Sequence, residues 1–450
     1  MTTERLSVIG LGKLGLPMAA CFAHKGYQVI GIDSNADIVR AVNEKECPLY
    51  EPGVADLVQN SRGLLSASND YGYAIENSDI TFIVVPTPSM EDGSLSTRYV
   101  EAATRSIAEV LKRKAGFHLI VIRSTVPPGT TEDVVRPLIE NVSGEKCGEG
   151  FGLCFCPEFL ALGTFIRDFL EPDMILIGES DSKSGELLTQ FFREVCENDP
   201  PIVRTTTYNA ELTKILLNAF VTMKIGFANT IAELCERMTS GDVDVVSRIL
   251  GFDSRIGRKY LTGGLAYGGP CFPRDEKALA SFARTLGCRA RLSEVAYEVN
   301  EHQISRIVRL VKHKVGGVTN RNVAILGLTY KPDTDVIEAS ASLEIAKALL
   351  QEGARISLYD PVGMENAKKV LREGKDVKFA NSVVECLTEA EFCILATPWD
   401  EFKRLKSGDF TSTMRKPVLL DCWRILDRSE FNKDLEYVAI GLGPERHPGT

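Results

Sequence analysis

The sequence lacks several features that would assign it to a special class of protein. No apolar segment reaches the ~18 uninterrupted residues of a membrane span, because Lys, Glu or Asn breaks each one. The start, MTTERLSVIG, shows no charged and then apolar leader. The net charge of −9 argues against a general nucleic-acid surface. We therefore expect a cytoplasmic protein with neither membrane nor nucleic-acid partners.

Cysteine is plentiful, but its spacing matches neither a metal site nor a disulfide framework. The 12 cysteines are spread along the chain, many inside apolar runs such as CILAT, which is typical of reduced thiols in the cytosol. Cys154 and Cys156 form the only close pair. Residues two apart alternate across a strand, and no second pair follows at zinc spacing, so no metal is predicted.

A glycine fingerprint near the start predicts a dinucleotide site. The apolar run LSVIG leads into Gly10, Gly12 and Gly15, and an apolar helical pattern follows. The next apolar run, YQVIGID, ends at Asp33, 18 positions after Gly15. The glycines allow a pyrophosphate to approach the helix N-terminus, and the carboxylate accepts hydrogen bonds from ribose hydroxyls. Because a carboxylate repels a 2′-phosphate, we expect NAD rather than NADP.

Two more apolar runs end in small polar residues. ITFIVVPTP covers 80–88 and HLIVIRSTVPPGT covers 118–130. The carboxyl ends of parallel strands face the ligand in an open α/β sheet, so Thr87, Ser124 and Thr125 are candidates for the cofactor edge. The alternative is that each simply ends a strand in a turn.

The same pattern returns near the end of the chain. NVAILGLTYKPDTD precedes a helical run, LEIAKALLQEG, and RISLYD then ends at Asp360 as YQVIGID ends at Asp33. The order of the later apolar runs also repeats. This predicts an α/β protein with a second doubly wound unit. Only Gly327 stands at the second turn, so we expect this unit to bind a different nucleotide from NAD.

The segment 205–238 predicts one long helix between the two halves, because it contains no proline and a single glycine. At 100° per residue, six polar residues fall within one narrow sector of this helix, and most of the other faces are apolar. Such a stripe is either a solvated face or the wall of a site. Its members are Glu211, Lys214, Asn218, Thr222, Asn229 and Glu233.

Cys271 lies in YGGPCFPRD, directly before a helical pattern that starts near Pro273. The free amides and positive dipole of a helix N-terminus favour a thiolate, and Arg274 adds a positive charge. These features are typical of a nucleophile. The alternative is a buried structural cysteine beside a glycine-rich loop.

With these motifs in this order, the sequence resembles the UDP-glucose/GDP-mannose dehydrogenase family over essentially its whole length. The shared stretches include VIGLGKLGLP, RSTVPPGT, CPEFLALGTFIRDFLEPD, NAELTKILLNAF, RIGRKYLTGGLAYGGPCFPRD and GLTYKPDTD. The resemblance implies an NAD-binding Rossmann domain at 1–203, a central helical domain with the catalytic cysteine and dimer contacts at 204–316, and a Rossmann-like sugar-nucleotide domain at 317–450. It also implies a homodimer or a higher homo-oligomer.

The resemblance implies that the 6-hydroxymethyl of a nucleotide sugar is oxidised twice to a carboxylate, through a thiohemiacetal and a thioester on Cys271. UDP-glucose is the expected substrate. The other catalytic residues implied are Lys214, Asn218, Asp275, Glu158 and Thr125. Substrate contacts are implied for Arg255, Tyr260, Gly268, Lys331, Phe159 and Leu160. Cofactor contacts are implied for Gly10, Gly12, Lys13, Leu14, Gly15, Asp33, Thr87, Ser124, Thr125 and Arg274.

The chain departs from the family pattern at five positions: Leu162, Thr262, Pro270, Glu338 and Trp423. If the segment after Glu158 turned helically, Leu162 would share a face with Glu158 and tune which hexose or cofactor pose is accepted. The alternative is that Leu162 points into the core.

Other functions stay open at this point. The same chemistry could act on GDP-mannose or a UDP-N-acetylhexosamine. A single-oxidation dehydrogenase of a 3-hydroxy acid would have no use for Cys271, and a non-catalytic nucleotide sensor would tolerate its loss.

Overall fold

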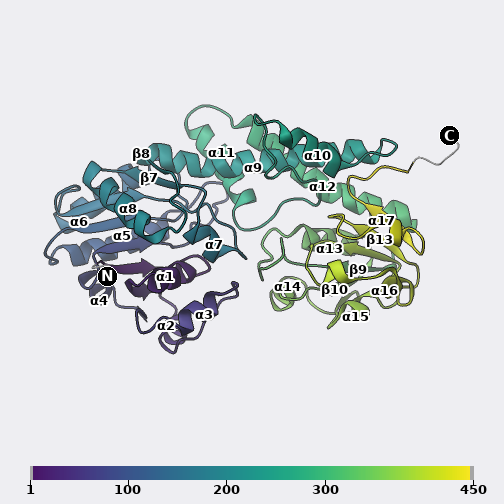
Figure 1. The fold of residues 1–450 in the computed structure, drawn as a ribbon, viewed down its shortest axis with the longest axis horizontal. Helices are drawn as coiled ribbons and strands as arrows, with labels where there is room; N and C mark the ends of the chain where they lie inside the picture. Colours follow the sequence, from purple (N-terminus) through teal and green to yellow (C-terminus); the bar gives the residue numbers. More distant parts are fainter. Residues whose placement is uncertain (1–3, 446–450) are drawn as a thin grey trace. The chain divides into compact units, whose positions relative to one another are not determined.

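A computed structural model describes residues 4–445, and the chain divides into two compact units (Figure 1). The first comprises Met1–Leu217 with Ser281–Cys288, and the second comprises Asn218–Ala280 with Arg289–Thr450. Each unit is built on one β-sheet with helices packed on both faces. The predicted α/β class with two doubly wound sheets is confirmed.

The sheet of the first unit has eight strands in the order β3-β2-β1-β4-β5-β6-β7-β8. All neighbours run parallel except β6 and β7, which are antiparallel. The strand order reverses direction after β1, so β1 and β4 flank the point where such sheets bind ligands. The strands are β1 (Arg5–Ile9), β2 (Gln28–Ile32), β3 (Leu65–Ser68), β4 (Ile80–Ile83), β5 (His118–Ile122), β6 (Phe151–Phe155), β7 (Ile175–Glu179) and β8 (Ile202–Thr206).

Both faces of this sheet are buried, and successive residues of each strand enter opposite cores. Leu119 and Val121 of β5 join the core beneath α1, whereas Ile120 and Ile122 join the core beneath α5. This explains why the strand sequences are continuous apolar runs rather than alternating ones. The helices of the unit are α1 (Gly15–His24), α2 (Ala36–Asn43), α3 (Val54–Gln59), α4 (Tyr71–Glu76), α5 (Arg98–Leu111), the π-helix η1 (Thr130–Val135), α6 (Arg136–Ser143), α7 (Phe165–Leu170) and α8 (Ser182–Val195).

The sheet of the second unit has six parallel strands in the order β11-β10-β9-β12-β13-β14, which repeats the order of the first six strands of the chain. Its two faces again carry separate cores. The strands are β9 (Asn322–Leu326), β10 (Arg355–Tyr359), β11 (Val377–Phe379), β12 (Phe392–Leu395), β13 (Val418–Asp421) and β14 (Glu436–Ala439). The helices are α10 (Val243–Phe252), α12 (Arg291–Val315), α13 (Ala341–Gln351), α14 (Met364–Val370), α15 (Val383–Leu387), the 3₁₀-helix η2 (Phe402–Arg404), α16 (Ser407–Thr411) and α17 (Arg428–Phe431).

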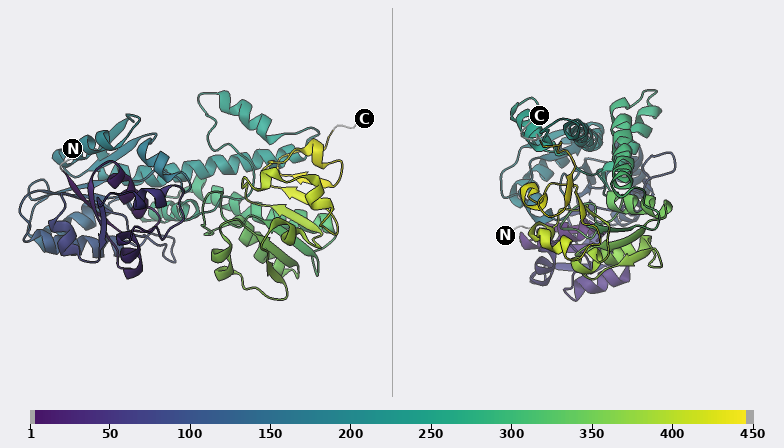
Figure 2. Two further views of the ribbon diagram at one scale, coloured as in Figure 1. Left: turned by 60° about the horizontal axis from the view of Figure 1, so that its bottom comes forward. Right: turned by 90° about the vertical axis from the view of Figure 1, so that its right-hand side faces the viewer.

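Helices α9 (Thr207–Glu236) and α11 (Phe272–Thr285) each begin in one unit and end in the other. The long helix predicted for 205–238 is therefore confirmed as α9, a single unbroken helix of 30 residues (Figure 2). Its length and composition alone would allow it to cross a membrane. However, 56% of its most apolar window is buried in the protein, as expected of a core helix.

Candidate active site

The glycine fingerprint forms the turn between β1 and α1. A Cβ at Gly10, whose φ is +93°, would lie 2.5 Å from the carbonyl oxygen of Val84, and one at Gly15 would lie 1.7 Å from that of Gly10. Packing therefore requires both glycines. A Cβ at Gly12 would meet no atom within 4 Å, so the close approach of a ligand to this backbone is the remaining reason for glycine there.

Asp33 lies just beyond β2 and completes the dinucleotide pattern. Its Oδ2 accepts a hydrogen bond from Leu11 N at 2.8 Å, and its Oδ1 accepts one from Asn35 N at 2.8 Å. These bonds fix the carboxylate at the carboxyl end of β2 while each oxygen keeps acceptor capacity for a ribose hydroxyl. The exposed Lys13 and half-buried Leu14 lie in the same turn. These residues fit NAD, which supplies hydride-accepting chemistry when it is bound.

We expect Asp33→Ala to weaken NAD binding and to improve use of NADP, because the repulsion of a 2′-phosphate is lost. The measurement is kcat/KM with each cofactor. Equal use of NADP and NAD by the unaltered protein would contradict the role given to Asp33.

Thr87, Ser124 and Thr125 come together at the carboxyl ends of β4 and β5. Thr87 Oγ1 donates to the Thr125 carbonyl at 2.7 Å, and Ser124 Oγ donates to the Val85 carbonyl at 2.7 Å. Both hydroxyls thus donate to backbone carbonyls, and the cofactor contacts of Thr87 and Ser124 stay predictions. The side chain of Thr125 is half-buried and stays a candidate for ligand contact.

Glu158 and Lys214 meet in the first unit. Lys214 Nζ donates to the backbone carbonyl of Glu158 at 2.6 Å and lies 5.2 Å from the ring centroid of Phe159. The side chain of Glu158 points to Arg123, whose Nε donates to Oε1 at 2.5 Å. Leu160 is half-buried beside the core. The resemblance thus named two residues that are neighbours in space, although 56 residues separate them in sequence.

Arg123 is a functional candidate that the sequence reasoning missed. Its side chain is 2% exposed and forms a buried ion pair with Glu158. It also donates to Cys156 Sγ at 3.0 Å and lies 5.3 Å from the ring centroid of Phe192. Although burial lowers the pKa of Arg123, the charge of Glu158 raises it overall. The signal in the sequence was an arginine directly after an apolar run and before STVPPG. A charge at the end of a buried strand requires a partner.

Glu211 joins α9 to the loop that carries Ser124 and Thr125. Its buried carboxylate accepts from Gly129 N at 2.6 Å, and from Thr131 N and Thr131 Oγ1 at 2.8 and 2.6 Å. Burial raises the pKa of Glu211 to about 7, although these hydrogen bonds lower it. Lys214 lies three residues further along the same helix, so this anchor also holds the lysine in place.

The stability of the protein is expected to depend on the ionisation of Glu211. Its pKa is raised in the folded protein, so the folded state binds the proton more tightly than the unfolded state. Stability linked to this group is therefore present at low pH and is lost as pH rises toward about 7, by a few kcal/mol at most. Urea midpoints at pH 5 to 8 for the unaltered protein and Glu211→Gln test this, and equal pH trends in both would contradict it.

Cys271 lies in the second unit, one residue before α11, and its side chain is exposed. Pro273 is the second residue of the helix, as predicted. Burial lowers the pKa of the neighbouring Arg274, but the charges of Asp275 and Cys271 raise it overall. The predicted setting of an accessible thiol beside a helix N-terminus and a guanidinium is therefore present. The alternative of a buried structural cysteine is wrong.

Asp275 is completely buried between two partners. Asn218 Nδ2 donates to its Oδ2 at 2.6 Å, and Arg274 Nε donates to its Oδ1 at 2.8 Å. Asn218 lies four residues after Lys214 on α9, so the two polar groups are one helical turn apart. Five of the six stripe residues are buried, which excludes the solvated-face reading of α9.

Packing requires the two glycines before Cys271. A Cβ at Gly268 would lie 2.1 Å from the Ala339 carbonyl oxygen, and one at Gly269 would lie 2.7 Å from the ring of Tyr330. Protein atoms thus fill the space where a side chain would lie at either position, and the contact of Gly268 with the substrate stays a prediction. Pro270 follows in a turn.

The second sheet repeats the ligand-binding edge of the first in a changed form. Gly327 has a φ of +95°, and a Cβ there would lie 2.4 Å from Thr397. Asp360 is 1% exposed and accepts from Leu328 N, Thr329 N and Trp399 Nε1, among other donors. Protein donors thus occupy the Asp360 carboxylate, which leaves it no capacity for the ribose hydroxyls of a dinucleotide. This agrees with the prediction that the second unit binds a different nucleotide from NAD.

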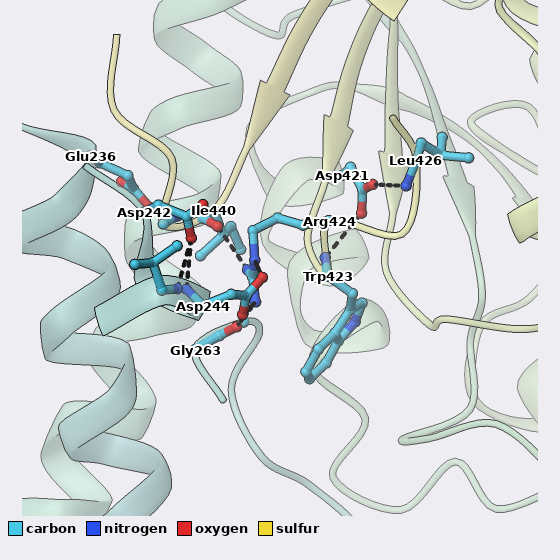
Figure 3. A network of polar contacts seen from close by, with 12 residues as sticks. Glu236, Asp242, Asp244, Gly263, Asp421, Trp423, Arg424, Leu426 and Ile440 are labelled. Atoms are coloured by element: carbon cyan, nitrogen blue, oxygen red, sulfur yellow. Dashed lines mark hydrogen bonds and ion pairs between the residues drawn. The ribbon is translucent and has the colours of Figure 1, made fainter. Parts of the chain in front are cut away.

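Arg424, next to the departure from the family pattern at Trp423, is buried in a polar network. Its side chain is 5% exposed, and it pairs with Asp244 at 2.7 Å and donates to the carbonyls of Gly263 and Ile440 (Figure 3). Trp423 points away from this network and donates through Nε1 to the Ala396 carbonyl at 2.7 Å. All three guanidinium nitrogens of Arg424 thus donate to groups within the protein.

The remaining predicted residues occupy varied environments in the structure. Arg255 is 87% exposed beside Asp253, and Tyr260 is 49% exposed with a φ of +66°. Lys331 Nζ lies 5.9 Å from the ring centroid of Tyr330. Thr262 and Glu338 are exposed. Within residues 4–445, no group of three metal-binding side chains comes together.

Leu162 is buried in a turn, and the segment after Glu158 is not helical. The premise that Leu162 shares a helical face with Glu158 is therefore wrong, because the helix α7 starts only at Phe165. The alternative that Leu162 points into the core is the one that the structure supports.

A dinucleotide turn with an acidic residue after β2, and a second doubly wound sheet, define an NAD-dependent dehydrogenase. Three family models cover most of the chain: the NAD binding domain of the UDP-glucose/GDP-mannose dehydrogenase family at 4–196, its central domain at 208–302 and its UDP binding domain at 324–428. The chain belongs to the UDP-glucose/GDP-mannose dehydrogenase family.

Individual relatives span nearly the whole chain. A UDP-glucose 6-dehydrogenase of Haloferax volcanii is 39% identical and covers 97% of this chain and 99% of its own length. A UDP-glucose 6-dehydrogenase of Rhizobium meliloti is 38% identical with the same coverage. The structure of a UDP-glucose dehydrogenase from Pyrobaculum islandicum is 35% identical, with a TM-score of 0.89 over 98% of both chains.

Proposed function

We propose that this protein oxidises the 6-hydroxymethyl group of UDP-glucose to the carboxylate, giving UDP-glucuronate, in two steps at one site. The observation that carries the proposal is the exposed Cys271 at the start of α11, in a chain that also has an NAD site. A single oxidation to an aldehyde needs no nucleophile. A cysteine provides the means to oxidise the aldehyde further.

In the proposed mechanism, the Cys271 thiolate attacks the aldehyde carbon, and the carbonyl oxygen becomes an alkoxide. Lys214 and Asn218 carry the donors that stabilise this negative charge. Loss of a hydride from the thiohemiacetal carbon, for which bound NAD would be the acceptor, leaves a thioester. Water then attacks the thioester carbonyl and the carbon–sulfur bond breaks, which releases the acid and the thiolate. Glu158 activates that water, Asp275 holds a water or takes the first proton, and Thr125 contacts the same water as Asp275.

UDP-glucose is proposed because relatives carrying that activity in their names match this chain at 31–39% identity over nearly its whole length. GDP-mannose and UDP-N-acetylhexosamines are the alternatives. A relative named GDP-mannose 6-dehydrogenase from Pseudomonas putida is 36% identical but matches only 79% of this chain. The half-buried Lys331 and the exposed Tyr260 and Arg255 are the proposed substrate contacts.

The test is to incubate the protein with NAD and UDP-glucose, UDP-galactose, UDP-N-acetylglucosamine or GDP-mannose, and to measure NADH per sugar consumed. Two NADH and an acid product support the proposal. One NADH per sugar would identify a single-oxidation dehydrogenase, and none would identify a nucleotide sensor.

We also propose that the protein forms a homodimer through α9 and α10, in the cytoplasm. The face of α9 opposite its polar stripe exposes apolar side chains: Phe220 by 59%, Phe227 by 57% and Leu234 by 59%. On α10, Ile249 is 59% exposed and Phe252 is 75% exposed. Large apolar side chains exposed on two helices in this way are typical of a subunit interface. The molar mass from light scattering tests this.

A further inference from the structure

A buried hydrogen bond spans the turn that carries Cys271. The hydroxyl of Tyr267 donates to Glu276 Oε2 at 2.5 Å, and both side chains lie within the second unit. Tyr267 is 8% exposed and Glu276 is 2% exposed. Tyr267 lies four residues before Cys271, and Glu276 lies on the first turns of α11 after it. The bond therefore closes a loop around the thiol.

Other contacts hold both ends of this loop. Asn300 of α12 binds the backbone of Tyr267 on both sides, accepting from its N–H at 2.8 Å and donating to its carbonyl at 3.0 Å. The ring of Tyr267 meets that of Phe272 edge to face, with centroids 6.1 Å apart. Gly269 N donates to the Glu338 carbonyl at 2.9 Å. The thiol itself remains exposed although its turn is fixed from within.

Nothing in hydrophobic packing requires a carboxylate at position 276. Glu276 Oε1 has no hydrogen-bond partner among the described residues, which is a costly arrangement for a buried carboxylate oxygen. Burial raises the pKa of Glu276 to about 7, although Tyr267 and Thr222 lower it by hydrogen bonding. Tyr297 of α12 is the other ionisable group near this pair. A leucine would fill the site without these costs, so the hydrogen bond has a use beyond filling space.

We infer that the Tyr267–Glu276 hydrogen bond is a clasp that fixes the Cys271 turn at the N-terminus of α11, so that both are positioning residues for the nucleophile. This rests on the proposed function of Cys271. A thiolate gains from the helix end only while its turn keeps its place on the first amides. Loosening the clasp lowers the reactivity of the thiol at a given pH without exposing it further.

The test compares Tyr267→Phe and Glu276→Leu, which break the bond, with Glu276→Gln, whose amide oxygen still accepts it. We expect the first two to lower kcat about tenfold while KM for NAD and sugar nucleotide stays within about threefold, since small misplacements of a reacting group are costly. They also move the pH midpoint of Cys271 alkylation by iodoacetamide upward. Glu276→Gln retains most activity, and the double variant Tyr267→Phe/Glu276→Leu is no worse than either single variant.

Peptide mass spectrometry separates Cys271 from the other exposed thiol, Cys288. The matched control is Tyr437→Phe, which removes a buried tyrosine–carboxylate bond of 2.9 Å to Asp421 in the same unit. If Tyr267→Phe lowers only thermal stability, as the control does, and leaves alkylation and kcat unchanged, the clasp is merely structural and the inference is wrong. Acid formation by Cys271→Ser would overturn the proposed nucleophile instead, and it would leave the alkylation result standing.

Discussion

Replacing Cys271 by serine is expected to abolish net formation of the acid, by at least ~10³-fold in kcat. A serine hydroxyl is hardly ionised near neutral pH, even at a helix N-terminus, and α11 itself carries no histidine to take its proton. The swap is nearly isosteric on an exposed side chain, so folding and NAD affinity should be unchanged. Quantifying acid and NADH in one assay measures the effect.

Cys288→Ser is the matched control, because Cys288 is the other exposed cysteine of the described residues and has no assigned role. It should retain full turnover. Two-step turnover in Cys271→Ser would rule out the covalent route, and slow release of an aldehyde would show that the first oxidation does not need the thiol.

Replacing Arg123 by methionine is expected to have the largest effect on stability. The change leaves the Glu158 carboxylate buried without its counter-charge, which typically costs about 3–5 kcal/mol. It also frees the segment whose carbonyl holds Lys214, so turnover should fall together with stability. Urea denaturation measures the first effect, and NADH release by the protein that remains folded measures the second.

Two further variants separate the causes. Arg204→Met breaks a partly exposed pair with Glu179 and should cost less than about 1 kcal/mol. The double variant Arg123→Met/Glu158→Gln removes both charges and should recover much of the stability without recovering activity. If the double variant is no more stable than Arg123→Met, the buried charge is not the cause of the loss.

The sequence by itself determined the class of fold and the cofactor. Apolar runs separated by helical patterns predict parallel strands. The same series of runs occurs in both halves of the chain, which explains why the second sheet has the strand order of the first six strands. The fingerprint from Gly10 to Asp33 was recognisable because its function depends on spacing along a short, continuous stretch. Cys271 was recognisable for the same reason, since a helix start is a local feature.

Only the tertiary structure decided which distant residues are partners. A buried charged group meets its hydrogen-bonding or ion-pair partner only when the chain has folded. The pairs found in this way are Arg123 with Glu158, Glu211 with Thr131, and Tyr267 with Glu276. Leu162 was misjudged because a spacing of four residues implies a shared face only inside a helix, and that segment is a loop that ends in a turn. The packing role of Gly268 and Gly269 was not visible in the sequence, because a sequence shows where a side chain is missing but does not show which atoms occupy the space.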